Sequence, residues 1–429
     1  MKIDIIKLTF QSSLPLLDQS VVSLSNFLTS LFIIRFMGIE AFGIFSICLL
    51  FVQFINSIQF SLISSPMMFL GPKRKVIDKQ TYFGSIFVYQ LFFSVATSVV
   101  IWVILNNTNI FNLQSQISNI ATPLVIVIFI FQNQDFLRRF LFVQNQYFFA
   151  LLIDVVSYLG RFIFLFFFLR TTIITLDHVF WSISFSAFLS ILLCTPKIRI
   201  LKFDSKYLFI SYKEHWLVGK WLVIATLLRW TSGNYFIITA GVILGPVAVG
   251  AIKAAENILG ILNIFLQGLE NIIPTRASSY FHKGSISTLA HYLFSIYIWG
   301  SVLIIFIILF VIIFASTIID FFYGNEFSGL EVLIYLYSIC YFLSFLILPL
   351  RCSLIILDKS KYIFTALIGT TIIALVTAKL FLVTFSSEGA VYGIILTQLA
   401  SIAFFSFYLR KEYKIRIKKI TNKIVNKKK

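Results

Sequence analysis

The sequence predicts an all-α polytopic membrane protein with about 12 transmembrane helices in two six-helix bundles, related by pseudo-two-fold symmetry along the membrane normal. Three observations lead to this fold class. The 429 residues are 59% hydrophobic and only 12% charged, whereas soluble chains are near half apolar and about a quarter charged. Long apolar segments recur from one end of the chain to the other. Basic residues gather in short runs between these segments, as they do in cytoplasmic loops.

A membrane crossing needs about 20 predominantly apolar residues, and twelve segments meet this requirement. They lie near 14–37, 43–70, 82–105, 120–143, 148–169, 178–195, 216–242, 250–273, 291–315, 331–357, 362–384 and 389–409. The predicted organisation is an N-terminal bundle (1–200), a cytoplasmic linker (201–215), a C-terminal bundle (216–409) and a basic cytoplasmic tail (410–429). No connection is long enough to form a separate soluble domain, so any function must reside inside the bundles.

The basic residues predict that both termini are cytoplasmic. With the N-terminus inside, the cytoplasmic segments contain 28 of the 35 Lys and Arg residues, including those of the connection at 138–147 and of the tail. This bias is the positive-inside rule. The net charge of +18 would otherwise suggest a nucleic acid as partner, but short runs between apolar segments form no basic groove, so we expect no nucleic acid.

The cysteines suggest neither a metal site nor a disulfide framework. All four lie within or at the ends of apolar segments, without the spacing of metal ligands. We interpret Cys48, Cys194, Cys340 and Cys352 as small apolar packing residues, and we expect no metal and no cofactor.

The two halves of the chain share a short repeated motif, which we call the echo. The segment Gly38–Gly43 (GIEAFG) closes the first span and opens the second, and Gly245–Gly250 (GPVAVG), 207 residues later, does the same for the seventh and eighth. Gly and Pro suit a tight turn, and small residues allow helices to approach closely. Transporters built from two parallel repeats bind substrate between the halves and alternate access to it.

Charged residues inside the spans are the main functional candidates, because each costs about 2.5–3.5 kcal/mol near the bilayer centre. The nine are Asp18, Asp154, Arg161, Lys220, Arg229, Lys253, Glu256, Glu270 and Lys379. Polar residues also recur every three or four positions in the first, second, seventh and eighth spans, which predicts a hydrophilic cavity. The candidate substrate-binding residues are Arg229, Arg161, Lys253, Asn26, Gln53, Asn56, Asn257, Asn263 and Gln267. The candidates for ion coupling are Asp18, Asp154, Glu256 and Glu270.

Simpler explanations exist for some of these charges. Lys253 and Glu256 could form an internal ion pair that lets the eighth span insert, and Glu270 could contact only Arg276 or water. Lys220 lies one turn into its span and would extend to the interface. The basic tail either binds the anionic inner leaflet through one apolar face or only sets the topology.

Four stretches resemble the polysaccharide (O-antigen-type) flippase family of the multidrug/oligosaccharidyl-lipid/polysaccharide exporter superfamily. Residues 18–46 are similar to the first helical hairpin of that family, 250–278 to its eighth helix, 321–336 to the turn that enters the tenth, and 134–156 to the connection between the fourth and fifth. The resemblance implies two six-helix bundles around a cavity that is typically cationic.

The resemblance also implies a function. We expect a flippase, not an enzyme, in the bacterial cytoplasmic membrane. Its substrate would be a polyprenyl-diphosphate-linked oligosaccharide and its driving ion H⁺ or Na⁺, with membrane lipids, a glycan polymerase and a chain-length regulator as further partners. Two alternatives stay open: a drug/cation antiporter of the same superfamily, and a membrane glycan polymerase, which usually needs a larger outer loop.

Overall fold

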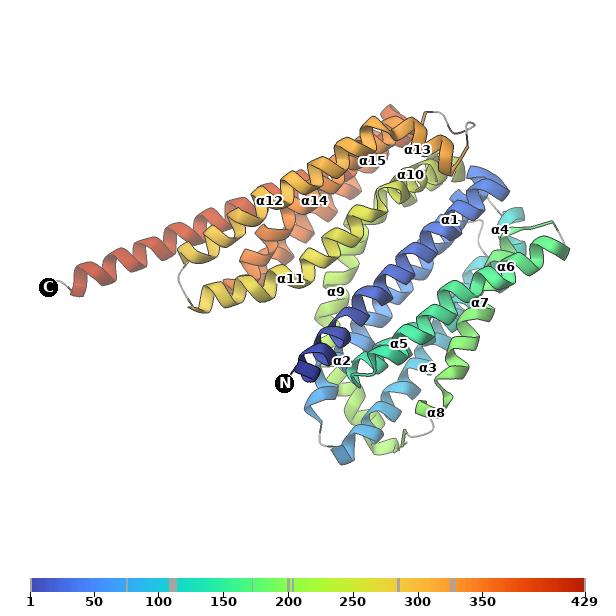
Figure 1. Cartoon of the computed structure of the whole chain (residues 1–429), viewed down its shortest axis with the longest axis horizontal. Helices are drawn as coiled ribbons and strands as arrows, with labels where there is room; N and C mark the ends of the chain where they lie inside the picture. The colour runs from blue at the N-terminus through green and yellow to red at the C-terminus, as the bar shows by residue number, and fades with distance from the viewer. Residues whose placement is uncertain are drawn as a thin grey trace. The chain divides into compact units, whose positions relative to one another are not determined.

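The computed structural model is all-helical in every element that it describes, which confirms the predicted fold class (Figure 1). It describes the backbone of residues 2–74, 76–107, 114–171, 173–198, 201–202, 204–283, 286–324, 327 and 329–427, and their side chains except in 2–13, 15–16, 76–78, 107, 114–119, 171, 206, 271, 275, 282–283, 286 and 413–427. The elements are α1 (Lys2–Gln59), η1 (Phe60–Ser64), α2 (Ser65–Leu70), η2 (Gly71–Lys73), α3 (Val76–Asn107), α4 (Gln114–Val143), α5 (Tyr147–Asp154), η4 (Val155–Leu159), α6 (Gly160–Thr171), α7 (Leu176–Leu193), α8 (Thr195–Ile198), α9 (Ser205–Ile243), α10 (Pro246–Ile258), α11 (Gly260–Lys283), α12 (Ile286–Ile313), α13 (Ala315–Phe322), α14 (Glu331–Ile356) and α15 (Ser360–Lys427).

The longest elements, α1 and α15, are each two helices joined at one non-helical residue. In α1 this residue is Gly38, whose φ of 82° is open to glycine because it has no Cβ. In α15 it is Ser386, with a φ of 53°. The halves of α15 run side by side, since the rings of Tyr362 and Tyr408 stack with their centroids 4.2 Å apart. Each element therefore supplies two membrane crossings.

The number of crossings agrees with the prediction. Eight described helices are long and apolar enough to cross a membrane, and the pair α10 and α11, bent by 60°, forms a ninth. The 39-residue α9 is long enough as well but is less apolar, since it carries Arg229 and Asn234. Counting α9 once and the two hairpins twice gives twelve crossings among the described residues.

The chain forms two compact units. Unit 1 comprises Met1–Leu227 with Gly245–Gly250, and unit 2 comprises Leu228–Leu244 with Ala251–Lys429. The border lies inside α9, whereas the sequence analysis places the linker at 201–215; those predicted borders and the two-bundle assignment stay predictions. The side chains of the tail beyond Glu412, and with them the apolar face predicted there, lie outside the described residues.

The first half of α9 belongs to unit 1 through close contacts with the second crossing. A Cβ on Gly219 would lie 3.2 Å from Leu62 Cα and Ser61 O, so glycine is the residue that lets the two backbones approach. Two turns further along α9, the hydroxyl groups of Ser61 and Thr226 share a hydrogen bond of 2.8 Å. These contacts explain why the boundary between the units falls after Leu227.

The two echo segments touch each other within unit 1. A Cβ on Gly43 would lie 1.8 Å from the carbonyl oxygen of Pro246, and one on Gly250 would lie 2.3 Å from that of Ile39. Real Cβ atoms do not approach backbone oxygens this closely, so only glycine fits at both positions. The repeated Gly residues of the sequence therefore mark a backbone-to-backbone contact.

Apolar clusters complete each unit. In unit 1 a cluster around Met67, Phe83 and Leu141 includes Cys194, and in unit 2 a cluster around Ile273 and Leu289 includes Cys352. All four cysteines are buried and free, as expected for packing residues.

Candidate functional site

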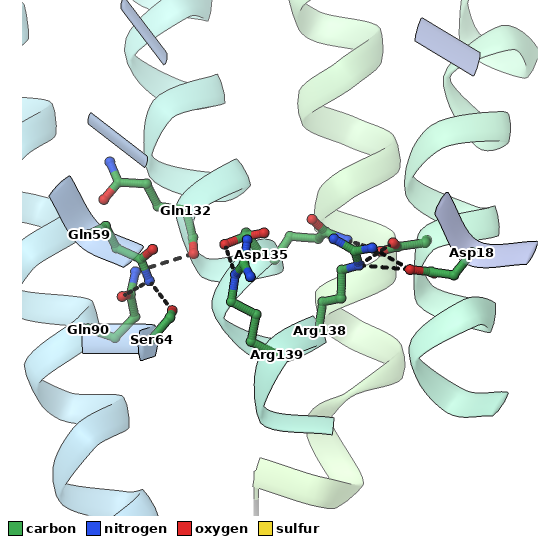
Figure 2. A network of polar contacts seen from close by, with 10 residues as sticks. Asp18, Gln59, Ser64, Gln90, Gln132, Asp135, Arg138 and Arg139 are labelled. Atoms are coloured by element: carbon green, nitrogen blue, oxygen red, sulfur yellow. Dashed lines mark hydrogen bonds and ion pairs between the residues drawn. The ribbon is translucent and has the colours of Figure 1, made fainter. Parts of the chain in front are cut away.

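The strongest polar site in unit 1 is an ion-pair triad that joins three membrane crossings. Arg138 of α4 lies between Asp18 of α1 and Asp154 of α5 (Figure 2). Its Nε atom is 2.6 Å from Asp154 Oδ2 and 3.1 Å from Asp18 Oδ2, and its Nη2 also donates to Asp18 Oδ2. The two carboxylates are 1% and 0% exposed. Such burial is tolerable for ions only when they are paired.

Additional groups hold the triad in place. Gln134, one turn before Arg138 on α4, donates from Nε2 to Asp154 Oδ1 over 2.7 Å. The other oxygen of Asp18, Oδ1, is buried and accepts no hydrogen bond in the described part of the chain. The sequence predicts Asp18 and Asp154 as separate candidates, and the structure brings them to the same guanidinium.

Arg138 is a candidate site residue that was not predicted from the sequence. From the sequence it is assigned to the basic residues of the cytoplasmic connection 138–147, because it lies near the end of a span and another arginine follows it. The structure corrects this, since Arg138 lies within α4, is 16% exposed, and points at buried acids. The signal that could have revealed it is the pair of acids on other helices, which need a cation.

A π-helical turn, η4, separates Asp154 from the second buried arginine of unit 1. Inserted π-turns often mark functional sites in α-helices. The carbonyl of Tyr158, in this turn, accepts a 3.0 Å hydrogen bond from Ser25 of α1. Arg161 follows on α6 and stacks its guanidinium 4.7 Å from the Tyr158 ring centroid. The Arg161 side chain is thereby oriented toward α1.

The partners of Arg161 on α1 are neutral. Its Nη1 lies 3.5 Å from Asn26 Oδ1 and 3.4 Å from Thr29 Oγ1. The side chain is 3% exposed, and its Nε has no hydrogen-bond acceptor among the described residues. The structure therefore joins two predicted binding residues, Asn26 and Arg161, without a carboxylate.

A buried amide network links the second, third and fourth crossings of unit 1 (Figure 2). Gln59 Nε2 donates to Gln90 Oε1 over 2.7 Å and to Ser64 Oγ over 3.0 Å. Gln90 in turn donates to the carbonyl of Gln132 over 3.3 Å. The amide nitrogens of Gln59 and Gln90 thus find partners, as buried polar groups generally do, while Oε1 of Gln59 and Oε1 of Gln132 accept no hydrogen bond among the described residues. We interpret the network as structural.

In unit 2 the predicted acids are also paired. Lys253 Nζ lies 2.7 Å from Glu256 Oε2, three residues along α10, as the simpler explanation of these two residues anticipates. Glu270 Oε1 lies 2.6 Å from Nη2 of Arg351 on α14. Its partner is thus Arg351, and not the Arg276 that the sequence suggested.

The remaining predicted binding residues lie along the same crossings. Arg229 is exposed on α9, and its charge interacts with those of Arg351 and Glu270 without a carboxylate within 4 Å among the described residues. The neutral candidates range from exposed (Gln53, Asn263) to partly buried (Asn56, Asn257, Gln267). Their role in substrate binding stays a prediction.

Outside the spans, a buried histidine secures the first turns of α9. His215 is 1% exposed, its Nδ1 faces the carbonyl of Leu62 at 3.3 Å, and its Nε2 faces the hydroxyl of Tyr82 at 2.8 Å. A carbonyl only accepts, so Nδ1 carries the hydrogen and Nε2 accepts from Tyr82. Both bonds thus require the neutral imidazole. Burial, and secondly the charge of Arg74, lower the pKa of His215 to about 4.

We therefore expect the free energy of unfolding to decrease as the pH is lowered. The unfolded chain binds a proton at His215 below about pH 6.5, whereas the folded chain resists protonation down to about pH 4. Stability from this residue is complete above pH 6.5 and declines toward pH 4, by on the order of 3 kcal/mol in total. Unfolding temperatures of the purified protein between pH 4.5 and 8 would measure this. The variant His215→Gln should have a shallower decline, and an unchanged slope would contradict the assignment.

Comparison with solved structures shows which known proteins share this fold. No protein-family model matches the chain, and no curated protein matches it in sequence. Solved structures match over almost the whole length. The lipid II flippase MurJ, in an inward closed conformation, has a TM-score of 0.74 at 13% sequence identity. The alignment covers 92% of this chain and 87% of the MurJ chain. The chain shares the fold of such transporters.

Two MATE transporters support the same assignment of the fold. An inward-facing multidrug resistance MATE transporter of the MOP superfamily has a TM-score of 0.69 at 14% identity, with 95% of both chains covered. The eukaryotic MATE transporter AtDTX14 has a TM-score of 0.65 at 15% identity and covers 94% of this chain and 96% of its own. At these identities the likeness establishes the fold, and the substrate must be argued from the site.

Proposed function

We propose that this protein is a flippase that moves polyprenyl-diphosphate-linked oligosaccharide repeat units from the inner to the outer leaflet of the cytoplasmic membrane by alternating access. Such units build O-antigen, capsule or exopolysaccharide. The observation that carries the proposal is how the charges pair. All four candidate acids contact a basic side chain, whereas Arg161 and Arg229 have no carboxylate within 4 Å in the described part of the chain.

Unpaired arginines suit an anionic substrate. A guanidinium binds phosphate oxygens through two parallel N–H donors, and the low dielectric constant of a membrane interior strengthens that attraction. Arg161 is held by the neutral side chains of Asn26 and Thr29, which leaves its charge uncompensated. In this mechanism an unpaired guanidinium contacts the diphosphate, the amide side chains contact the sugars, and the polyprenyl tail stays in lipid.

A drug/cation antiporter is the second candidate, favoured by the MATE structures that share the fold. A binding site for cationic drugs needs free carboxylates. Because the predicted acids of both units are occupied by Arg138, Lys253 and Arg351, the charge pairing favours the glycan substrate.

Deletion of the gene, with radiolabelled lipid-linked intermediates followed in both leaflets, tests the proposal. We expect complete single-repeat intermediates to accumulate on the cytoplasmic side, and a plasmid copy of the wild-type gene to restore export. Single repeats stranded on the outer side would instead indicate a polymerase. Unchanged glycan together with lost drug resistance would indicate the antiporter, and either result would overturn the flippase proposal.

A further inference from the structure

The Asp18–Arg138–Asp154 triad has a geometry that bears on which ion the protein can bind. Oδ2 of Asp18 and Oδ2 of Asp154 both contact Nε of Arg138, at 3.1 and 2.6 Å. Two atoms that contact one nitrogen at these distances lie within about 6 Å of each other, and the two carboxyl groups interact directly. The guanidinium therefore occupies the space that faces both acids.

The triad has more negative than positive charge. Two carboxylates and one guanidinium leave an excess of one negative charge in a site that is almost closed to water. The described titratable neighbours of the acids are Tyr158 and Cys194. Another cation of this unit, Arg161, is seven residues beyond Asp154, about 10 Å along a helix, and stacks on Tyr158. It therefore does not cancel the excess locally.

These facts distinguish a proton from a metal cation. A sodium ion needs several oxygen ligands around it, and the two oxygens that face each other here, Oδ2 of Asp18 and Oδ2 of Asp154, already contact a fixed positive charge. A second cation would also be repelled by the guanidinium. A proton needs no such coordination shell, because it adds to one carboxyl oxygen and neutralises the excess charge.

We propose that Arg138 is the specificity-determining residue of this acid pair: it excludes sodium and other metal cations and leaves a site that exchanges protons only. The inference concerns the ion and not the glycan. If it fails, the proposed function is unaffected, and if the glycan assay fails, the inference still holds for another substrate.

Unfolding temperatures of the purified protein in detergent test the proposal, with sodium chloride titrated against choline chloride at constant ionic strength. Wild type is expected to show no sodium-dependent shift. The variant Arg138→Gln should unfold at a lower temperature, because two buried carboxylates lose their partner, and sodium should restore several degrees in a saturable manner. Arg139→Gln is the matched control, since Arg139 is the next residue of α4, pairs with Asp135, four positions before it, and stacks on Phe60; it should show no shift.

Direct binding of ²²Na⁺ keeps the proposal testable even if Arg138→Gln does not fold. Wild type should bind none above the level of Asp154→Asn. Binding to wild type that Asp154→Asn abolishes would overturn the proposal, as would a folded Arg138→Gln protein that sodium does not stabilise. A sodium shift in wild type equal to that of Arg138→Gln would overturn it as well.

The proton part has its own readout in the pH dependence of the unfolding temperature above pH 6.5, where His215 is already neutral. As the acid pair loses its proton, the excess charge should lower the unfolding temperature of wild type. Asp154→Asn removes that excess and leaves a balanced pair of Asp18 and Arg138, so its profile should be flat. Identical profiles for the two proteins would refute proton exchange at this site.

Discussion

Replacing Gly43 with alanine is expected to destabilise unit 1 by about 3 kcal/mol, at the upper end of the usual cost of overpacking. The new Cβ would lie 1.8 Å from the carbonyl oxygen of Pro246. Since the obstructing atom belongs to the backbone, no side-chain rotation relieves the clash, and the 38–43 and 245–250 turns must separate. Thermal unfolding of the purified variant, followed by tryptophan fluorescence, measures the loss.

Two other glycine substitutions serve as comparisons. Gly250→Ala places its Cβ 2.3 Å from the carbonyl oxygen of Ile39, so it should act in the same direction. A Cβ on Gly233, within α9, meets no atom within 4 Å, and the better helix propensity of alanine favours that change by about 1 kcal/mol. If Gly43→Ala were as stable as Gly233→Ala, the turn-to-turn contact would not exist in the folded protein.

Replacing Arg229 with alanine is expected to reduce glycan export roughly 10- to 100-fold, because a hydrogen bond to a charged group contributes about 1.5–3 kcal/mol. Arg229 is exposed on α9 and has no carboxylate within 4 Å among the described residues, so its charge is available to an anionic substrate. Arg229→Lys should recover part of the activity, since lysine keeps the charge and loses the planar pair of donors. Surface glycan per cell, at matched protein levels in the membrane, is the measurement.

Lys379→Ala is the matched control for this loss of charge. Lys379 is another predicted intramembrane cation, on α15 of the same unit, with an exposed side chain. We expect the control to export glycan at the wild-type rate. Full export by Arg229→Ala would remove this arginine from the mechanism.

The helices and their breaks could be predicted from the sequence because their causes are local. Apolar length specifies a membrane crossing, and the break in α1 falls at Gly38, where the echo begins. Asp18 and Asp154 could be singled out for a similar reason, since a charge in a span is costly wherever the span packs. These inferences need no knowledge of which helices are neighbours.

The partners of those residues could not be predicted, because pairing depends on helix packing. Arg138 is 120 residues from Asp18, and its position near the end of a span favoured a role in topology. Likewise Glu270 pairs with Arg351, 81 residues away, although Arg276 is much closer in sequence. Helical spacing predicts which residues share a face of one helix, but it does not predict which residues of other helices pack against that face.

The uncharged amide network was missed for a different reason. Gln59, Gln90 and Gln132 are fully buried, yet a glutamine in an apolar segment costs less to insert than a charge and therefore attracts less notice. Only when the second, third and fourth crossings pack together do Gln59, Gln90 and the backbone carbonyl of Gln132 become partners.

The separation of the triad along the chain has a consequence for biosynthesis. Asp18 leaves the ribosome 120 residues before Arg138, which at about 5–20 residues per second amounts to roughly 6–24 s of translation. During that interval the first helix must enter the bilayer with an acid that has no partner, so it has to be retained by the insertion machinery or wait at the interface. Nascent chains arrested before α4 should therefore remain bound to that machinery, and chains long enough to expose Arg138 should be released into lipid.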